Sequence, residues 1–350
     1  MQRELKYDIA KGIAIILVIV GHGHCISPLT LSFIYSFHMP LFFIIAGVFY
    51  HERGIKESVR MDFRRLMIPY FVFAALAAMK FSVSKGILQG DIQAVIDCIT
   101  AMCWMSATGH HSLLFSDIPT VGIIWFLTTL FVCKNLYNIL LRMTNDRHKL
   151  MLVCILISIA GVAGDILVNL PFGILTGCGA LVFYMAGNML KTYKPTNAIL
   201  AIGGGIWLAC IFKSYLSMAT NRYGCYPLDV IGAVAATILM VRLSDKIGKS
   251  RVGEYLAWMG RNSMVLIEAL AHIGQVDIIN FCDKKISEDS ENCNIIYENY
   301  ISDENPATHQ HNLSTRIQKY IKPFNPQSHF TINRENESAD FTSQMRSIIN

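Results

Sequence analysis

Charged residues are scarce in this chain. Asp, Glu, Lys and Arg make up 16% of its 350 residues, whereas about a quarter is usual in a soluble domain. Hydrophobic residues reach 53%, and the mean hydropathy is +0.41. Such a shortage of charge excludes an ordinary soluble domain. Together with apolar runs of about 20 residues, it predicts an all-α fold, a polytopic bundle of transmembrane helices.

Several short catalytic and metal-binding motifs are also absent. The sequence has no Walker loop, HExxH or GxSxG, and no CxxC or Cys/His spacing typical of a metal site. The ten cysteines are scattered, and several lie inside apolar runs, such as Cys133, Cys154 and Cys178. We therefore expect no metal site and cysteines that serve as small packing residues.

The apolar runs predict about nine membrane-spanning helices, since each span needs about 20 residues. A shorter run, 94–107, is interrupted by Asp97 and predicts an interfacial or re-entrant segment instead. The nine longer runs are 9–26, 31–50, 66–84, 118–141, 150–170, 172–190, 197–216, 227–243 and 255–281.

Basic residues are concentrated in alternate loops. The positive-inside rule places the basic loops in the cytoplasm, together with the N-terminus. We expect an integral membrane protein, in a bacterial plasma (inner) membrane. The opposite loops contain little beyond Lys85, Lys213 and Arg222. The basic loops contain Arg3, Lys6, Arg53, Lys56, Arg60, Arg64, Arg65, Arg142, Arg147, Lys149, Lys191, Lys194, Arg242, Lys246, Lys249 and Arg251.

The composition changes near residue 283. Residues 1–282 contain the apolar runs and form the expected membrane domain. Residues 283–350 are polar, rich in Asn, Ser, Glu, Lys and His, and lack long apolar runs. This composition is typical of a disordered tail.

Lys11 and His22 lie eleven residues apart in the first apolar run. Eleven helical steps of 100° come close to three full turns, so both side chains are predicted on one helix face, about 16 Å apart along the axis. Asp8, three residues before Lys11, is placed to pair with it. An intramembrane histidine is rare and marks function by default. The alternative is a snorkelling lysine and a packed, hydrogen-bonded histidine.

His38 lies two residues before Pro40 in the second apolar run. Proline removes a backbone donor and kinks a helix just before it. The kink frees carbonyl groups near His38 and can open a polar pocket there. The alternative is that His38 only satisfies the freed carbonyls.

Three arginines, Arg60, Arg64 and Arg65, precede the third apolar run. A guanidinium group matches phosphate oxygens in bidentate fashion, so the cluster is a candidate phosphate site. Such clusters are also the ordinary signal for cytoplasmic loops.

Two other segments carry weaker signals. Trp125-Phe126-Leu127 predicts a lipid-facing or core-packing segment, and Gly260-Arg261-Asn262-Ser263 predicts the start of a helix. Glu268 and His272, four residues apart, are expected to face each other on the last helix.

The first 130 residues resemble the acyltransferase 3 family of integral membrane acyltransferases, and in particular its fucose 4-O-acetylase-like branch. Lys11 and His22 match the family pattern of a basic residue, ten residues and a histidine. An Arg-x-x-Arg motif expected before the third helix is absent, and Ala46 stands where serine is usual. The other matching segments are Asp8-Ile9-Ala10-Lys11-Gly12, Gly21-His22, Phe37-His38-Met39-Pro40-Leu41-Phe42-Phe43, Ala46-Gly47 and Arg65-Leu66-Met67-Ile68-Pro69-Tyr70.

This resemblance implies an O-acetyltransferase of about ten helices. It would move an acetyl or other acyl group from acyl-CoA, supplied from the cytoplasm, to a hydroxyl of a sugar or cell-surface glycan. The expected cofactor-binding residues for the acetyl-CoA phosphates are Lys11, Arg64 and Arg65. His22 is the expected general base, and His38 is expected to orient it or to stabilise an oxyanion.

Two other function classes fit the same sequence. Membrane histidines also serve as proton relays in transporters and flippases, although no internal repeat is evident. The second alternative class is a non-catalytic member of the family that binds a ligand. The expected partners are the lipid bilayer, acyl-CoA and a glycan acceptor, with no nucleic acid and no permanently bound cofactor. The oligomeric state is left open.

Overall fold

A computed structural model describes residues 4–22, 26–82, 90–105, 121–144, 146–248, 250–263 and 265–266. The chain divides into two compact units, residues 1–21 with 32–272 and residues 22–31 with 273–350, and each is described by itself. The described part is almost entirely helical, which confirms the predicted all-α fold. Its helices are α1 (Leu5–Gly21), α2 (Pro28–Tyr35), α3 (His38–Val48), α4 (Ile55–Asp62), α5 (Ile68–Phe81), α6 (Ile92–Trp104), α7 (Trp125–Met143), α8 (Arg147–Leu167), α9 (Ile174–Gly179), α10 (Leu181–Met189), α11 (Asn197–Lys213), α12 (Tyr226–Ile247) and α13 (Arg251–Arg261).

Short elements join some of these helices. A π-helical turn, η1 (Phe63–Met67), connects α4 to α5, and the 3-10 turns η3 (Gly122–Ile124) and η4 (Pro171–Gly173) precede α7 and α9. The strands β1 (Leu216–Ser217) and β2 (Arg222–Tyr223) form an antiparallel hairpin between α11 and α12. Tyr223 pairs with Leu216 in its register.

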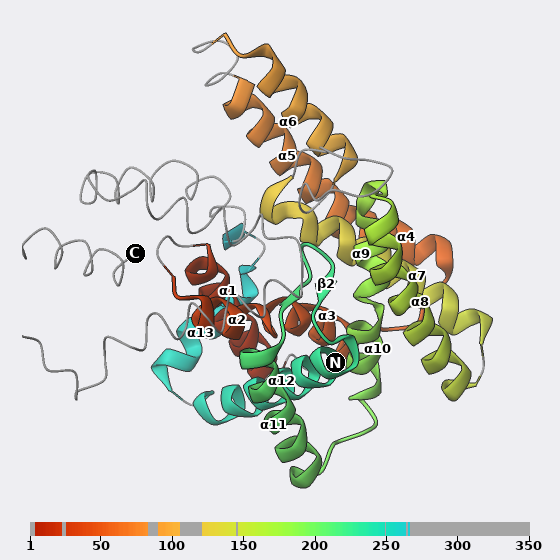
Figure 1. The fold of residues 1–350 in the computed structure, drawn as a ribbon, viewed down its shortest axis with the longest axis vertical. Coiled ribbons are helices and arrows are strands. Elements are labelled where there is room, and N and C mark those ends of the chain that lie inside the picture. Colours follow the sequence, from red (N-terminus) through yellow and green to blue (C-terminus); the bar gives the residue numbers. More distant parts are fainter. Residues whose placement is uncertain are drawn as a thin grey trace, which may run out of the picture. The chain divides into compact units, whose positions relative to one another are not determined.

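Helices α1 and α13 lie side by side, although they are far apart in the sequence (Figure 1). They cross where two glycines face each other. A Cβ atom added to Gly12 would overlap the backbone carbonyl of Leu256, and one added to Gly260 would overlap that of Asp8. Small residues allow membrane helices to approach at backbone distance. This crossing fixes α13 against the helix that carries Lys11.

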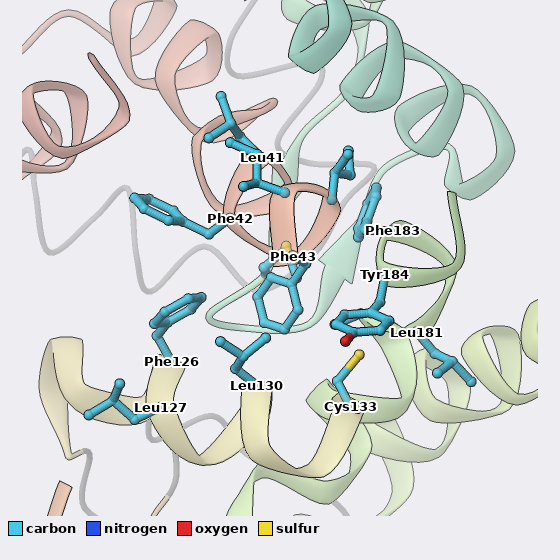
Figure 2. Packing of buried hydrophobic residues seen from close by; sticks show 14 of the residues in the cluster. Leu41, Phe42, Phe43, Phe126, Leu127, Leu130, Cys133, Leu181, Phe183 and Tyr184 are labelled. Carbon is cyan, nitrogen blue, oxygen red and sulfur yellow. The ribbon is translucent and has the colours of Figure 1, made fainter. Parts of the chain in front are cut away.

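Helices α3 and α10 make the same kind of crossing. A Cβ atom on Gly47 would overlap the Tyr184 carbonyl, and one on Gly187 would overlap the Ile44 carbonyl. The side chains of α3 and α10 meet those of α7 in one buried cluster, which Figure 2 shows. Phe126 of α7 packs edge-on against Phe43, with ring centroids 5.4 Å apart.

The segment Trp125-Phe126-Leu127 belongs to this cluster. The three side chains are 5%, 7% and 4% exposed, so they pack in the core rather than face lipid. Of the two alternatives that the sequence left open, the structure therefore selects core packing.

Replacing Gly187 with alanine tests the close crossing of α3 and α10. The added methyl group has no free space, so the backbones must separate, and we expect a loss of about 1–3 kcal/mol in stability. Gly205→Ala on α11 is the matched control, because open space surrounds that position. Thermal unfolding of the detergent-solubilised chain should show a lower transition for Gly187→Ala only. Equal transitions would contradict the crossing.

Each of the nine predicted spans overlaps a helix of the structure. Among the described residues, four helices are long and apolar enough to cross a membrane, or five if a pair bent by 50°, Pro171–Gly179 with Leu181–Met189, forms one span. The four are Pro28–Val48, Gly122–Met143, Arg147–Leu167 and Tyr226–Ile247. Asn197–Lys213 is apolar but shorter. The predicted total of nine or ten membrane-spanning helices stays a prediction.

Helix α13 ends at Arg261, Asn262 forms a turn, and Ser263, Val265 and Leu266 are helical again, which agrees with the helix start predicted at Gly260–Ser263. Helix α13 begins after Ser250, whose Oγ accepts a hydrogen bond from the Gly253 N–H at 3.0 Å. At its other end, the Asn262 N–H donates to the carbonyls of Trp258 and Met259. The expected pair Glu268 and His272 and the tail 283–350 lie outside the described residues.

Candidate functional site

Lys11 and Asp8 form an ion pair in the first helix. Lys11 Nζ lies 3.2 Å from Asp8 Oδ1, and the Asp8 side chain is 5% exposed, whereas that of Lys11 is 23% exposed. This confirms the pairing expected from their spacing of three residues. The backbone carbonyl of Asp8 lies at the α1–α13 crossing beside Gly260, and Lys11 is the more exposed partner of the ion pair.

His22 lies one residue beyond the end of α1. The helix extends from Leu5 to Gly21, and His22 occupies the turn that follows, with an exposed side chain. The predicted helical phase from Lys11 therefore holds as far as Gly21. His22 belongs to the second unit, so its alignment with Lys11 stays a prediction.

His38 is the first residue of α3 and is buried, 4% exposed. Its Nδ1 lies 2.7 Å from the Ile34 carbonyl oxygen, and its ring lies 5.3 Å from that of Tyr35. A carbonyl oxygen only accepts, so the proton of a neutral His38 resides on Nδ1 and Nε2 keeps a lone pair. His38 therefore satisfies a carbonyl at the helix break and also retains a basic nitrogen.

The break between α2 and α3 lies at Ser36 and Phe37, where the sequence predicts a kink. Pro40 has no N–H to donate to the Ser36 carbonyl, which interrupts the helical ladder at this point. The Ser36 hydroxyl donates to the Phe33 carbonyl at 2.7 Å and accepts from Trp207 Nε1 at 2.8 Å. A small polar pocket lies beside the bend, but His38, near which the sequence predicts a pocket, is not among the residues that line it.

Arg64 and Arg65 lie on the π-helical turn η1, and both are exposed. Pro69 follows four residues after Arg65, and its ring would clash with the Arg65 carbonyl in a regular α-helix, which explains the wider turn. Among the ion pairs of the described residues, none involves either arginine. Both guanidinium groups are therefore available to an anion. The turn packs against α4, α5 and α7, whereas α1 packs against α3, α12 and α13.

A buried ion pair lies just before this turn. Lys134 Nζ of α7 contacts Asp62 Oδ1 of α4 at 2.5 Å, and the side chains are 23% and 2% exposed. The Ser58 hydroxyl approaches the other Asp62 oxygen at 3.5 Å. The pair ties the arginine-bearing segment to the core of the bundle.

A polar network continues from the end of α3 to α10. The Tyr50 hydroxyl donates to Asn138 Oδ1 at 2.5 Å, and Asn188 Nδ2 donates to the Tyr137 hydroxyl at 2.6 Å. Lys191 donates to the Tyr50 carbonyl, and burial lowers the pKa of Lys191. These bonds hold the loop after α3 against α7 and α10.

A family model described as an acyltransferase domain, Acyl_transf_3, matches residues 4–266. The chain belongs to the acyltransferase 3 family. The match runs from before Asp8 to beyond α13, so it includes all five predicted site residues of this acyltransferase. No curated protein and no solved structure gives a significant match. Family membership and the apolar helices together show a membrane acyltransferase; its fucose 4-O-acetylase-like branch stays a prediction.

Three charged residues of this acyltransferase were missed in the sequence. Lys134 interrupts the apolar run 118–141, and Asp229 lies near the start of the run 227–243, where each is a charge inside a predicted span. Asp62 lies among basic residues before the third apolar run, so its sequence context gives no sign that it is buried. Charges inside membrane helices are costly, so Lys134 and Asp229 indicate buried polar sites in the same way as the two histidines.

Proposed function

We propose that this chain is an O-acetyltransferase that moves an acetyl group from acetyl-CoA to a hydroxyl of a sugar or cell-surface glycan. One observation carries the proposal: the acyltransferase match includes α1, with Lys11 in its ion pair and His22 just after its last residue. The 17 residues of α1 correspond to a length of about 25 Å. A long, thin donor with its charge at one end suits that layout.

The donor would bind through its phosphates to Lys11, Arg64 and Arg65. The exposed arginines have no ion pair among the described residues, and guanidinium groups bind phosphate in bidentate fashion. Asp8 lowers the net positive charge next to Lys11, so the arginines would supply most of the attraction. The basic loops support a cytoplasmic approach of the donor.

The chemistry requires a base for the acceptor hydroxyl. His22 would remove the hydroxyl proton as the oxygen attacks the thioester carbonyl. The carbon–sulfur bond would then break, and the proton held by His22 would pass to the leaving sulfur, so that CoA is released as the thiol. With Nδ1–H already donated to Ile34, neutral His38 is suited to accept a hydrogen bond or a proton. It is less suited to donate to an oxyanion, which favours the orienting role.

Mass spectrometry of surface glycans from cells with and without the protein tests the proposal. We expect glycans that carry one more acetyl group when the protein is present. Identical glycans in the two cell lines, with the protein present at normal levels in the membrane, would refute it. Counterflow of a solute in proteoliposomes without an acyl donor would favour a transporter instead.

Replacing Arg64 and Arg65 together with glutamine tests the donor site. Each charged hydrogen bond to a phosphate contributes about 1.5–3 kcal/mol, so we expect the KM for acetyl-CoA to rise at least about tenfold, with a smaller change in kcat. Lys149→Gln is the matched control, because Lys149 is exposed at the start of α8 and outside the site. An unchanged KM in the double variant would remove the arginines from the donor site.

A further inference from the structure

Helix α4 buries polar side chains and exposes apolar ones. Its buried residues are Ser58 and Asp62, and Asp62 makes the ion pair with α7. Ile55, Val59 and Phe63, spaced four residues apart, are all exposed. A helix that faces water has the opposite arrangement, with its apolar stripe turned to the core. The exposed apolar stripe therefore indicates a neighbour other than water.

The apolar stripe continues into α5. Ile68, Val72 and Leu76 are exposed as well, and they follow Phe63 at steps of five, four and four residues. The step of five coincides with the π-helical turn η1, where one turn takes about five residues. The stripe therefore stays on one side of the segment. Because α5 lies in the predicted span 66–84, the same stripe leads from the hydrocarbon of the membrane to its surface.

A stripe of basic residues runs beside the apolar one on α4. Lys56 and Arg60 each follow an apolar member by one residue, which places them about 100° further around the helix axis. Both side chains are exposed, and no ion pair of the described residues includes either. Arg64 continues the stripe and belongs to the proposed donor site. Lys56 and Arg60 therefore carry positive charge that neither the fold nor the donor site uses.

Glu57 lies on the side of α4 away from the apolar stripe. It precedes Val59 by two residues, which places it about 160° away around the axis, and it is exposed. The order around the helix is thus a buried polar face, an apolar stripe, a basic stripe and an acid. In an interfacial helix the apolar face enters the acyl chains and basic side chains flank it at the headgroups. Helix α4 has this arrangement, with its acid farthest from the lipid.

We propose that α4 lies in the headgroup layer of the membrane and that Lys56 and Arg60 bind the phosphate of an anionic phospholipid. With eight residues, α4 is about 12 Å long and too short to span a bilayer. Ile55, Val59 and Phe63 insert among the acyl chains, while the two basic side chains extend to the headgroups. A phospholipid offers an acyl chain to one stripe and a phosphate to the other, whereas a free phosphate leaves the apolar stripe in water. The site does not depend on the proposed acetyl transfer.

Native mass spectrometry of the full-length chain in a nonionic detergent tests the site without any acyl donor. The probes are phosphatidylglycerol, which is anionic, and phosphatidylcholine, which has no net charge. We expect the wild-type chain to bind phosphatidylglycerol more tightly. Each basic residue near an anionic surface strengthens binding about fivefold, so Lys56→Gln combined with Arg60→Gln should weaken phosphatidylglycerol binding at least about tenfold. Binding of phosphatidylcholine should not change.

The matched control combines Arg147→Gln with Lys149→Gln. These two residues are exposed at the start of α8, a candidate membrane span, and they represent the basic end of an ordinary cytoplasmic loop. The control removes the same charge from another helix. Its loss of phosphatidylglycerol binding should be less than about twofold, well below the fivefold that one specific contact contributes.

A tryptophan added on either side of α4 reports which side faces the acyl chains. Val59→Trp lies on the apolar stripe and Glu57→Trp on the far side, and the wild-type emission is subtracted from each. In phosphatidylglycerol liposomes with brominated acyl chains, Val59→Trp should lose most of its added emission. Glu57→Trp should keep its added emission and be quenched by acrylamide from the water.

Three results would overturn the inference. The first is a double variant of Lys56 and Arg60 that binds phosphatidylglycerol as tightly as the wild type. The second is an equal loss in the α8 control, which would reduce the stripe to an ordinary topology signal. The third is no quenching of Val59→Trp by brominated lipid; a dimer in detergent would then assign the apolar stripe to a second copy of the chain. Acetyl transfer by a chain without lipid selectivity would refute the lipid site alone, whereas selective lipid binding without transfer would refute the enzyme alone.

Discussion

Replacing His22 with alanine lowers kcat/KM for acetyl transfer by about 100- to 10,000-fold. This is the range that a positioned general base contributes, and the exposed imidazole after α1 is the group assigned to that role. The measurement is acetyl transfer to glycan by the purified chain, with acetyl-CoA binding recorded in parallel. We expect binding to persist, because the proposed phosphate contacts come from Lys11, Arg64 and Arg65.

His148→Ala is the control for the loss of a histidine. Its side chain is exposed at the start of α8, where its backbone N–H, not its imidazole, donates a hydrogen bond to Asp146 Oδ1. This variant should transfer acetyl groups at the wild-type rate. If His22→Ala retained more than about a tenth of the wild-type rate, His22 would not be the base.

Replacing Lys134 with methionine destabilises the chain by about 3–5 kcal/mol, the usual cost of removing one partner from a buried ion pair. The Asp62 carboxylate is 2% exposed, so it would remain buried and uncompensated. Removing Asp62 instead leaves Lys134, which is 23% exposed and can extend toward water. We therefore expect Asp62→Leu to be the milder change.

The double variant Lys134→Met with Asp62→Leu completes the cycle. It removes both charges, so its stability should recover most of the loss caused by Lys134→Met alone. Thermal unfolding in detergent gives the order of the four proteins. A double variant that is less stable than either single variant would show that the two residues do not act as a pair.

Local features of the site followed from the sequence because they depend on neighbours in the chain. The spacing of three residues predicts the ion pair of Asp8 with Lys11. Pro40 predicts the break in the helical ladder between α2 and α3. His38 contacts the Ile34 carbonyl, which also accepts from the Phe37 N–H, and not the Ser36 carbonyl that Pro40 frees. The helices likewise follow from apolar runs of span length.

Long-range contacts could not be predicted from the sequence, because patterns in a single sequence do not indicate which helices pack together. Gly12 and Gly260 are separated by most of the chain, and nothing local shows that each makes room for the other helix. Asp62 and Lys134 are 72 residues apart. Lys134 stands out in the sequence as a charge within an apolar run, but only the three-dimensional structure identifies Asp62 as its partner.

Helix ends followed from the sequence only in part. The segment 260–263 predicts a helix start, and the described residues are helical again from Ser263. The end of α13 was not predicted, although Arg261 is a basic residue in its last turn, where a cation is stabilised. The first helix likewise ends at Gly21, a residue type common at helix ends, which places His22 in a turn.

The most direct test of the central claim follows the acetyl group itself. The purified full-length chain, reconstituted in liposomes, is given acetyl-CoA labelled in the acetyl group together with surface glycan from the native cells. The account predicts that label enters the glycan and that an equal amount of free CoA thiol is released. Label that stays in acetyl-CoA, while the folded chain still binds the donor, would contradict the account and identify a non-catalytic binder.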